Sequence, residues 1–150
     1  MNKVKIILIN IIGIIIIFID QITKRFILKN PDIFRGFSIG NFLHITLSKN
    51  YNLAFGINIS HSILYLLIGL IILFLFNLLK KNYFSNDLTK VLIITIILSG
   101  AISNLIDRIF LGYVVDFINI SWFSIFNFAD ICIVLGIVFF IKIELFKKTG

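Results

Sequence analysis

The strongest constraint on this fold is a set of four long apolar runs separated by shorter polar stretches. A helix that crosses a bilayer needs roughly 20 mostly apolar residues. The sequence therefore predicts spanning helices at about 6–22, 61–79, 88–106 and 128–145. The first run follows a basic start but is succeeded by Asp20–Lys24 rather than by a small-residue cleavage site, which indicates a retained anchor and not a signal peptide.

Composition leads to the same class of protein. The chain has 150 residues, of which 59% are hydrophobic and 14% charged. A soluble domain is closer to half apolar and a quarter charged. A single small domain leaves much of its surface exposed, so it could not bury this many apolar side chains away from water. We therefore predict one membrane-embedded domain over residues 1–150.

Several functions are excluded at this point. The net charge is +7, but the basic residues do not form an interleaved patch, so no nucleic-acid partner is expected. Cys132 is the only cysteine, which excludes a disulfide framework, an Fe–S cluster and a multi-cysteine zinc site. His44 and His61 lack an HExxH context. We expect no metal and no cofactor.

The Lys and Arg residues set the expected topology, because cytoplasmic connections are enriched in them. Eight of them lie on the side of the termini and six on the other side. The eight occupy very short segments, whereas five of the six belong to one long loop, so both termini are predicted to be cytoplasmic. The first group is Lys3, Lys5, Lys80, Lys81, Lys90, Lys142, Lys147 and Lys148, and the second is Lys24, Arg25, Lys29, Arg35, Lys49 and Arg108.

The acidic residues have the opposite bias. With four alternating spans, five of the seven fall at the non-cytoplasmic face or in its adjoining loop, and only Asp87 and Glu144 lie on the other side. Ionisable groups at membrane depth are costly, so this face is the default functional site. Its polar residues are Asp20, Lys24, Asn50, Asn104, Asp107, Arg108, Asp116, Asn127 and Asp130, with Asp32 in the loop.

Both connections on that face have recognisable patterns. In residues 42–48 of the first outer loop (about 25–60), apolar and polar side chains alternate, which predicts a half-buried strand followed by a turn at 50–52. The second outer loop, 112–125, contains Trp122 and is too apolar for a free loop. We expect it to lie at the membrane interface.

Each polar group has a structural alternative. Asp20 and Lys24 are four residues apart and could be an interfacial ion pair that ends the first span. Small residues at 99–101 and 103 permit close helix packing, and Asn104 with an Asp107–Arg108 pair could simply join helices there.

Asp116 and Asp130 also have alternatives. Asp116 lies among apolar residues and could point to water, while Asp130 could complement a helix start that Asn127 caps. As a pair they offer chemistry, because two close carboxylates cannot both ionise cheaply and share a proton. One can then activate a water while the other donates to a carbonyl, without a nucleophilic side chain or a metal.

Five blocks of the chain resemble the lipoprotein signal peptidase (signal peptidase II) family. They correspond to the family patterns DQxTK, NxGxAFG, GAxxNxxDR, GxVxDF and FNxAD, in order and at the expected helix ends. Asn52 stands where the second pattern usually has Gly, which affects only local loop geometry, because Asn is also tolerated at positive φ. The blocks are Asp20–Lys24, Asn50–Gly56, Gly100–Arg108, Gly112–Phe117 and Phe126–Asp130.

The resemblance implies an all-α integral membrane fold, a four-helix bundle with a small extramembrane β-sheet from the first outer loop. It implies an aspartic endopeptidase with Asp116 and Asp130 as the catalytic dyad, which removes signal peptides from diacylglyceryl-modified prolipoproteins before the lipidated cysteine. It places the enzyme in the bacterial cytoplasmic (inner) membrane, in contact with lipid and with its site toward the outer leaflet, and we expect a monomer. The implied supporting or substrate-binding residues are Asp20, Lys24, Asn50, Asn104, Asp107, Arg108, Asn127 and Ala129.

Two other functions stay open from the residues alone. A small proton-coupled transporter could use the same carboxylates, although transport predicts charges near the middle of the bilayer. A non-catalytic assembly subunit would need the aspartates only for complex formation. The assembly alternative does not explain why Asp116 lies outside any predicted span, and the transporter alternative does not explain why the carboxylates cluster at one face.

Overall fold

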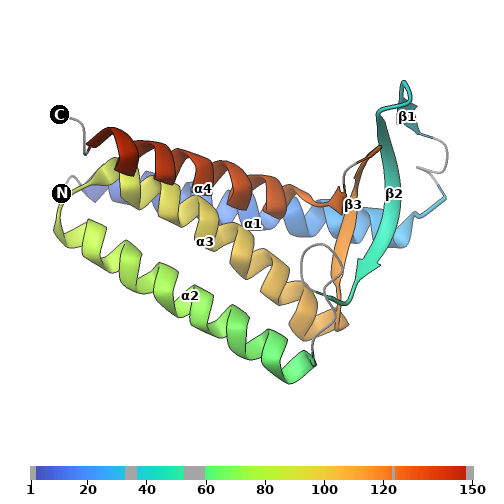
Figure 1. Cartoon of the computed structure of the whole chain (residues 1–150), viewed down its shortest axis with the longest axis horizontal. Helices are drawn as coiled ribbons and strands as arrows, with labels where there is room; N and C mark the ends of the chain where they lie inside the picture. Colours follow the sequence, from blue (N-terminus) through green and yellow to red (C-terminus); the bar gives the residue numbers. More distant parts are fainter. Residues whose placement is uncertain (1–2, 33–36, 53–59, 123, 148–150) are drawn as a thin grey trace.

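The structure is a computed structural model, and it describes residues 3–32, 37–52, 60–122 and 124–147. Within them the chain forms a bundle of four helices with a small sheet across one end (Figure 1). The helices and strands, in chain order, are α1 (Lys3–Lys29), β1 (Ser38–Ile39), β2 (Leu43–Asn50), α2 (His61–Phe84), α3 (Leu88–Leu111), β3 (Val114–Ile120), β4 (Ile125–Phe126) and α4 (Phe128–Lys147).

Every predicted span is present as a helix, and each extends beyond its predicted end. The difference is largest in α1, which ends at Lys29 rather than near residue 22. Asp20 and Lys24 therefore lie inside the helix, and the prediction that they end it is wrong. Their charges neutralise one another in a buried ion pair, so the helix does not need water at this point.

Helix α3 is the centre of the bundle and packs against α1, α2 and α4. Asp87 caps its start through a side chain that accepts a hydrogen bond from the Lys90 N–H at 3.2 Å, and Gly112, with φ of 81°, caps its end. The predicted close approach at its small residues is confirmed. A Cβ on Gly100 would lie 2.7 Å from the Ala129 carbonyl oxygen, so only Gly lets α4 pack this close.

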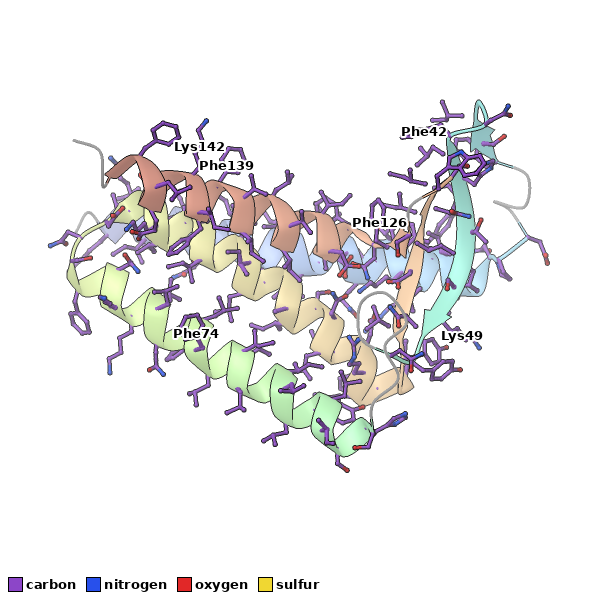
Figure 2. The ribbon with its side chains drawn as sticks, in the orientation of Figure 1. Phe42, Lys49, Phe74, Phe126, Phe139 and Lys142 are labelled. Carbon is purple, nitrogen blue, oxygen red and sulfur yellow. The ribbon has the colours of Figure 1, made fainter. Side chains whose placement is uncertain are left out.

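The outer surface of the bundle is apolar. Large hydrophobic side chains of α1, α2 and α4 are widely exposed, as Figure 2 illustrates for Phe74 and Phe139. By length and composition, α1, α2 and α3 could cross a membrane within the described part of the chain. Helix α4 has 20 residues, and its apolar stretch is bounded by Asp130 at one end and by Lys142 and Glu144 at the other. The fold is thus a mostly helical membrane-type fold.

The sheet is antiparallel in the order β1-β2-β3-β4. The strand predicted at 42–48 is confirmed as β2, which pairs Ile45 with Ile118 and, beyond a bulge, Ser48 with Asp116. The prediction that the sheet comes from the first outer loop is incomplete, because β3 and β4 belong to the second. Its apolar residues form a strand because β2 satisfies their backbone groups, and Val115 and Phe117 are buried.

The first described residue of α1 and the last of α4 lie at one end of the bundle, opposite the sheet (Figure 1). The sheet end also receives Asp20, Lys24, Asp107, Asp116 and Asp130. The polar residues that the sequence assigned to a common face are therefore on a common face.

Candidate active site

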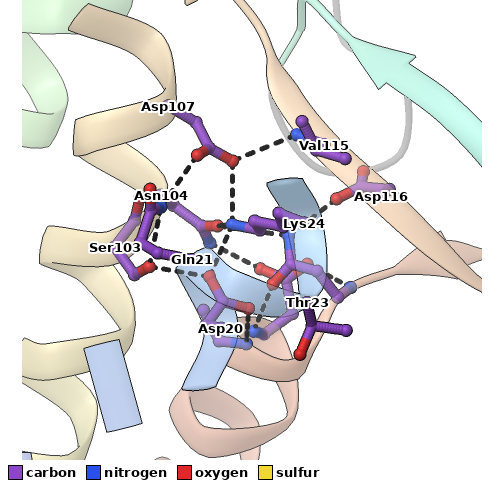
Figure 3. A network of polar contacts seen from close by, with 12 residues as sticks. Asp20, Gln21, Thr23, Lys24, Ser103, Asn104, Asp107, Val115 and Asp116 are labelled. Atoms are coloured by element: carbon purple, nitrogen blue, oxygen red, sulfur yellow. Dashed lines mark hydrogen bonds and ion pairs between the residues drawn. The ribbon is translucent and has the colours of Figure 1, made fainter. Parts of the chain in front are cut away.

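The site is built around a lysine with almost no contact with solvent. Lys24 is 1% exposed, and its Nζ lies 2.7 Å from Asp20 Oδ2 and 2.9 Å from Asp107 Oδ2. The same ammonium donates a hydrogen bond to Asn104 Oδ1 at 2.8 Å (Figure 3). A charge buried in this way is tolerated only when it is paired and its donors are satisfied. Lys24 therefore holds α1 against α3.

Both carboxylates next to Lys24 also bind other elements. Asp20 Oδ1 accepts the Ala129 backbone N–H at 2.9 Å, which fixes the start of α4. Asp107 Oδ2 accepts the Val115 N–H at 3.1 Å, which fixes β3 beside α3. Each carboxylate thus pairs with Lys24 and also positions an element that carries a candidate catalytic aspartate. Asp20 positions α4, and Asp107 positions β3.

Two asparagines connect this buried cluster to those aspartates. Asn104 Oδ1 accepts a hydrogen bond from Lys24 Nζ at 2.8 Å, and Asn104 Nδ2 donates to Asp130 Oδ1 at 2.8 Å. Asn127, fully buried, donates its Nδ2 both to Asn104 Oδ1 at 3.1 Å and to Asp116 Oδ1 at 2.7 Å. Asp116 and Asp130 are therefore oriented by one continuous set of hydrogen bonds.

Asp130 also caps the helix that carries it. Its backbone N–H donates to Asn127 Oδ1 at 2.9 Å, and its own Oδ2 accepts the Asn127 N–H at 3.1 Å. This reciprocal arrangement is a capping box, so the capping alternative for Asp130 is confirmed. The Asp130 carboxylate also accepts the hydrogen bond from Asn104, so it is fixed at the N-terminus of α4.

Asp116 does not point to water, because only 2% of its surface is exposed. Burial raises the pKa of Asp116 to about 6, and the charge of Asp130 contributes to the rise, while hydrogen bonds from Asn50 and Asn127 oppose it. Asn50 donates its Nδ2 to Asp116 Oδ2 at 3.0 Å. A carboxyl with such a pKa can hold a proton near neutrality and exchange it, as acid–base catalysis requires.

The two aspartates line one pocket of about 480 Å³. Its polar wall also contains Asn50, Asn104 and Arg108, and its apolar wall comes from β4 and one side of α4. Arg108 donates to the Asn52 carbonyl oxygen at 3.1 Å, and its buried Nε has no hydrogen-bond partner in the described part of the chain. The pocket therefore combines paired carboxylates with a long apolar surface.

All eight predicted supporting residues and both predicted catalytic ones lie in or next to this cluster. One detail is different: Asp107 takes its cation from α1, through Lys24, rather than from Arg108 beside it. The four residues that complete the second family pattern, 53–56, lie outside the described residues.

Sequence reasoning missed two members of the cluster. Gln21 donates to Asp107 Oδ1 at 2.9 Å, and Ser103 donates to Asp20 Oδ2 at 2.7 Å. Both residues belong to blocks that carry the family resemblance, and both are polar residues at buried or half-buried helix positions. That combination was the available signal, because a polar group inside a membrane bundle needs a partner.

The protein thus belongs to a class of membrane proteins with paired carboxylates held at one end of a helix bundle. The comparisons with known proteins agree with this class. Residues 12–146 match the family model described as Signal peptidase (SPase) II. The chain is 42% identical to the lipoprotein signal peptidase of Wigglesworthia glossinidia brevipalpis, over 85% of this chain and 87% of the relative. It is 35% identical to that of Clostridioides difficile (strain 630), over 93% and 95%.

Two solved bacterial membrane enzymes have similar structures. One superposes with a TM-score of 0.79 at 30% identity and covers 95% of this chain and 89% of the other. The second has a TM-score of 0.78 at 29% identity, with 91% and 92% covered. The chain belongs to the signal peptidase II family, whose members are membrane aspartic proteases. Its function is that of a signal peptidase II, which replaces the transporter and assembly-subunit alternatives.

Proposed function

We propose that Asp116 and Asp130 are the catalytic dyad of this peptidase. The observation that carries the proposal is that the two carboxylates come from different elements, β3 and α4, and line the same pocket. Asn104 and Asn127 hold both of them through hydrogen bonds between 2.7 and 3.1 Å. No other pair of acidic residues in the described part of the chain lines this pocket.

The dyad acts as a single acid–base unit that shares one proton. The ionised carboxylate removes a proton from water, whose oxygen attacks the scissile carbonyl carbon, while the protonated carboxyl donates to the carbonyl oxygen. The carbon–nitrogen bond of the tetrahedral intermediate then breaks, and the amide nitrogen leaves with a proton from the dyad. The raised pKa of Asp116 suits a carboxyl that holds the shared proton near neutral pH.

The substrate is a prolipoprotein, as the names of the relatives indicate. The finer assignment is a diacylglyceryl-modified prolipoprotein that is cut before its lipidated cysteine. The apolar wall of the pocket supports this, since Ile131, Val134 and Leu135 of α4 line it beside the carboxylates. Acyl chains or an apolar signal peptide can lie along that wall while the peptide bond reaches the dyad.

We further propose that all four helices cross the bacterial inner membrane as one domain, with both termini cytoplasmic and the site at the outer leaflet. The apolar exposed side of α4, with Val134 and Val138 more than half exposed, supports its placement in lipid. The charge distribution supports the orientation. The protein is proposed to act as a monomer, because one chain supplies both carboxylates and the hydrogen-bond donors that orient them.

The test is cleavage of a lipidated prolipoprotein by the purified variants Asp116→Asn and Asp130→Asn. Each should lose at least about 100-fold in rate, since each removes one partner of the acid–base unit. Asp87→Asn is the matched control, because Asn also caps a helix and Asp87 lies at the opposite end of the bundle. Normal cleavage by both dyad variants would overturn the assignment.

A further inference from the structure

One exposed region has no part in the chemistry described above. Phe37, Ile39, Phe42 and Trp122 lie at the far end of the sheet, and we refer to them as the distal patch. They are 51%, 61%, 62% and 102% exposed. Hydrogen bonds from the Ser121 N–H to the Phe42 carbonyl at 2.9 Å and from Ser121 Oγ to the Asn41 carbonyl at 2.7 Å join their two turns.

The distal patch projects to one side of the bundle. The strands cross the bundle end at a steep angle to the helices, and the β1 end of the sheet extends past α4 (Figure 1). Phe42 lies at this end of β2, whereas Lys49 lies at the other (Figure 2). The helices are embedded in lipid, and the strands run across the end of the bundle. The whole sheet therefore lies at the same depth in the membrane as that end of the bundle.

The sequence around the distal patch contains no charge. Residues 36–48 and 117–129 include no Asp, Glu, Lys or Arg, and Arg35 and Lys49 border the first of these stretches. Sheet edges in water are usually protected by charged side chains against pairing with other chains. An exposed apolar patch without them marks a surface that is covered by something else.

Trp122 adds an independent observation. It has a φ of 73°, in the left-handed region that bulky residues rarely adopt, and its side chain is fully exposed. Among the described residues, nothing contacts this exposed aromatic ring in a way that would compensate for the strained backbone. Tryptophan is favoured at the headgroup level of a bilayer, where its ring is buried and its indole N–H finds polar partners.

We propose that the distal patch inserts into the headgroup–acyl boundary of the membrane and holds the sheet against the lipid surface. The occupant is the bilayer rather than a second protein, for two reasons. The apolar surface of the bundle is adjacent, and the chain segments around the patch have no charge. The proposal does not depend on the catalytic assignments, because the patch contains none of those residues.

The protein carries its own probe, because Trp122 is the only tryptophan. The native chain is placed in lipid nanodiscs, where both membrane faces are open to solvent, at one protein per disc. Trp122 emission should be blue-shifted from that of the unfolded chain and quenched by phospholipids brominated near the headgroup end of their acyl chains. Iodide in solution should quench it weakly. Iodide quenching as strong as in the unfolded chain would overturn the proposal, and protection from iodide without lipid quenching would show a protein contact instead.

Two variants test the patch as a unit. Phe42→Ser and Ile39→Ser should each red-shift Trp122 emission and reduce its quenching by brominated lipid, with far-UV circular dichroism checking that the fold is retained. Phe110→Ser is the matched control, since Phe110 is 79% exposed at the end of α3 and lies outside the patch. If the folded patch variants leave the lipid quenching unchanged, the patch does not bind the membrane.

Discussion

Lys24 and Lys90 are buried at opposite ends of the bundle, and their surroundings differ. Lys24 at the sheet end is 1% exposed and lies between two carboxylates that are themselves 0% and 3% exposed. Lys90 at the other end is 7% exposed and pairs with Glu144, whose side chain is half exposed. The Lys24 ammonium is thus enclosed by buried groups, whereas the carboxylate that pairs with Lys90 is also hydrated.

The two ion pairs should respond differently to the loss of one partner. An enclosed ion pair contributes little net stability, because desolvation offsets the attraction, but removal of one partner leaves the other charge stranded. A pair open to water loses little, since water replaces the missing partner. The sheet end should therefore tolerate far less change than the opposite end, and the predictions below compare the two.

The largest effect on stability is expected from Lys24→Met. It leaves Asp20 and Asp107 buried without a cation, which should lower the free energy of unfolding by about 3 to 5 kcal/mol. Thermal unfolding in detergent measures the loss. The variant should also cleave prolipoprotein poorly, because Asn104 loses the donor that orients it. A variant that unfolds like the native chain would mean that water reaches these carboxylates.

A smaller loss is expected where α3 and α4 meet beside the site. Gly100→Ala places a methyl group 2.7 Å from the Ala129 carbonyl oxygen, and backbone must shift to accept it. Such overpacking costs about 1 to 3 kcal/mol. Gly69→Ala in α2 is the matched control, because nothing described lies within 4 Å of its new methyl group. There the substitution should stabilise the helix slightly. Equal effects of the two changes would contradict the close packing at Gly100.

The third prediction concerns the pH dependence of cleavage. Asp116 has a pKa raised to about 6, so the dyad loses its shared proton, and kcat/KM falls, as the pH rises through this region. Asn50 stabilises the ionised form through its hydrogen bond. Asn50→Ala should therefore raise the pKa of Asp116 further and move the falling limb to higher pH by about one unit.

The pH profile of Asn30→Ala provides the control for this experiment. Asn30 donates to the Phe26 carbonyl after the end of α1 and has no bond to the dyad. Its profile should match that of the native enzyme. If the limb of Asn50→Ala stays in place or moves to lower pH, then Asp116 does not govern it.

Much of the sheet end could be predicted from the sequence. The apolar runs locate all four helices, and the alternation of residues 42–48 locates β2, because both patterns follow directly from where side chains point. The ten residues that the acidic bias and the family blocks assign to the site all lie in or next to the buried cluster. These features follow from the spacing of residues along the chain and from the alternation of the spans, and both can be read from one sequence.

What could not be predicted depends on contacts between distant segments. The end of α1 was placed too early because Lys24 looks like the polar end of a span until Asp107, 83 residues later, is known to neutralise it. The strand β3 looked like an interfacial loop because its pairing with β2 is not visible in either segment alone. The roles of Gln21 and Ser103 depend in the same way on how α1 packs against α3.

The smallest effect is expected from Lys90→Met at the end opposite the site. Methionine has a similar volume and can keep the contact with Phe140, whose ring centre lies 5.8 Å from the lysine Nζ. Glu144 remains half exposed to water after the change, so the free energy of unfolding should change by less than about 1 kcal/mol. Cleavage of prolipoprotein should stay at the native rate, since no bond links Lys90 to the dyad among the described residues. The informative measurement is the ratio of the two lysine variants in one unfolding experiment. A loss in Lys90→Met that approached the loss in Lys24→Met would mean that enclosure by carboxylates is not what makes the sheet end sensitive.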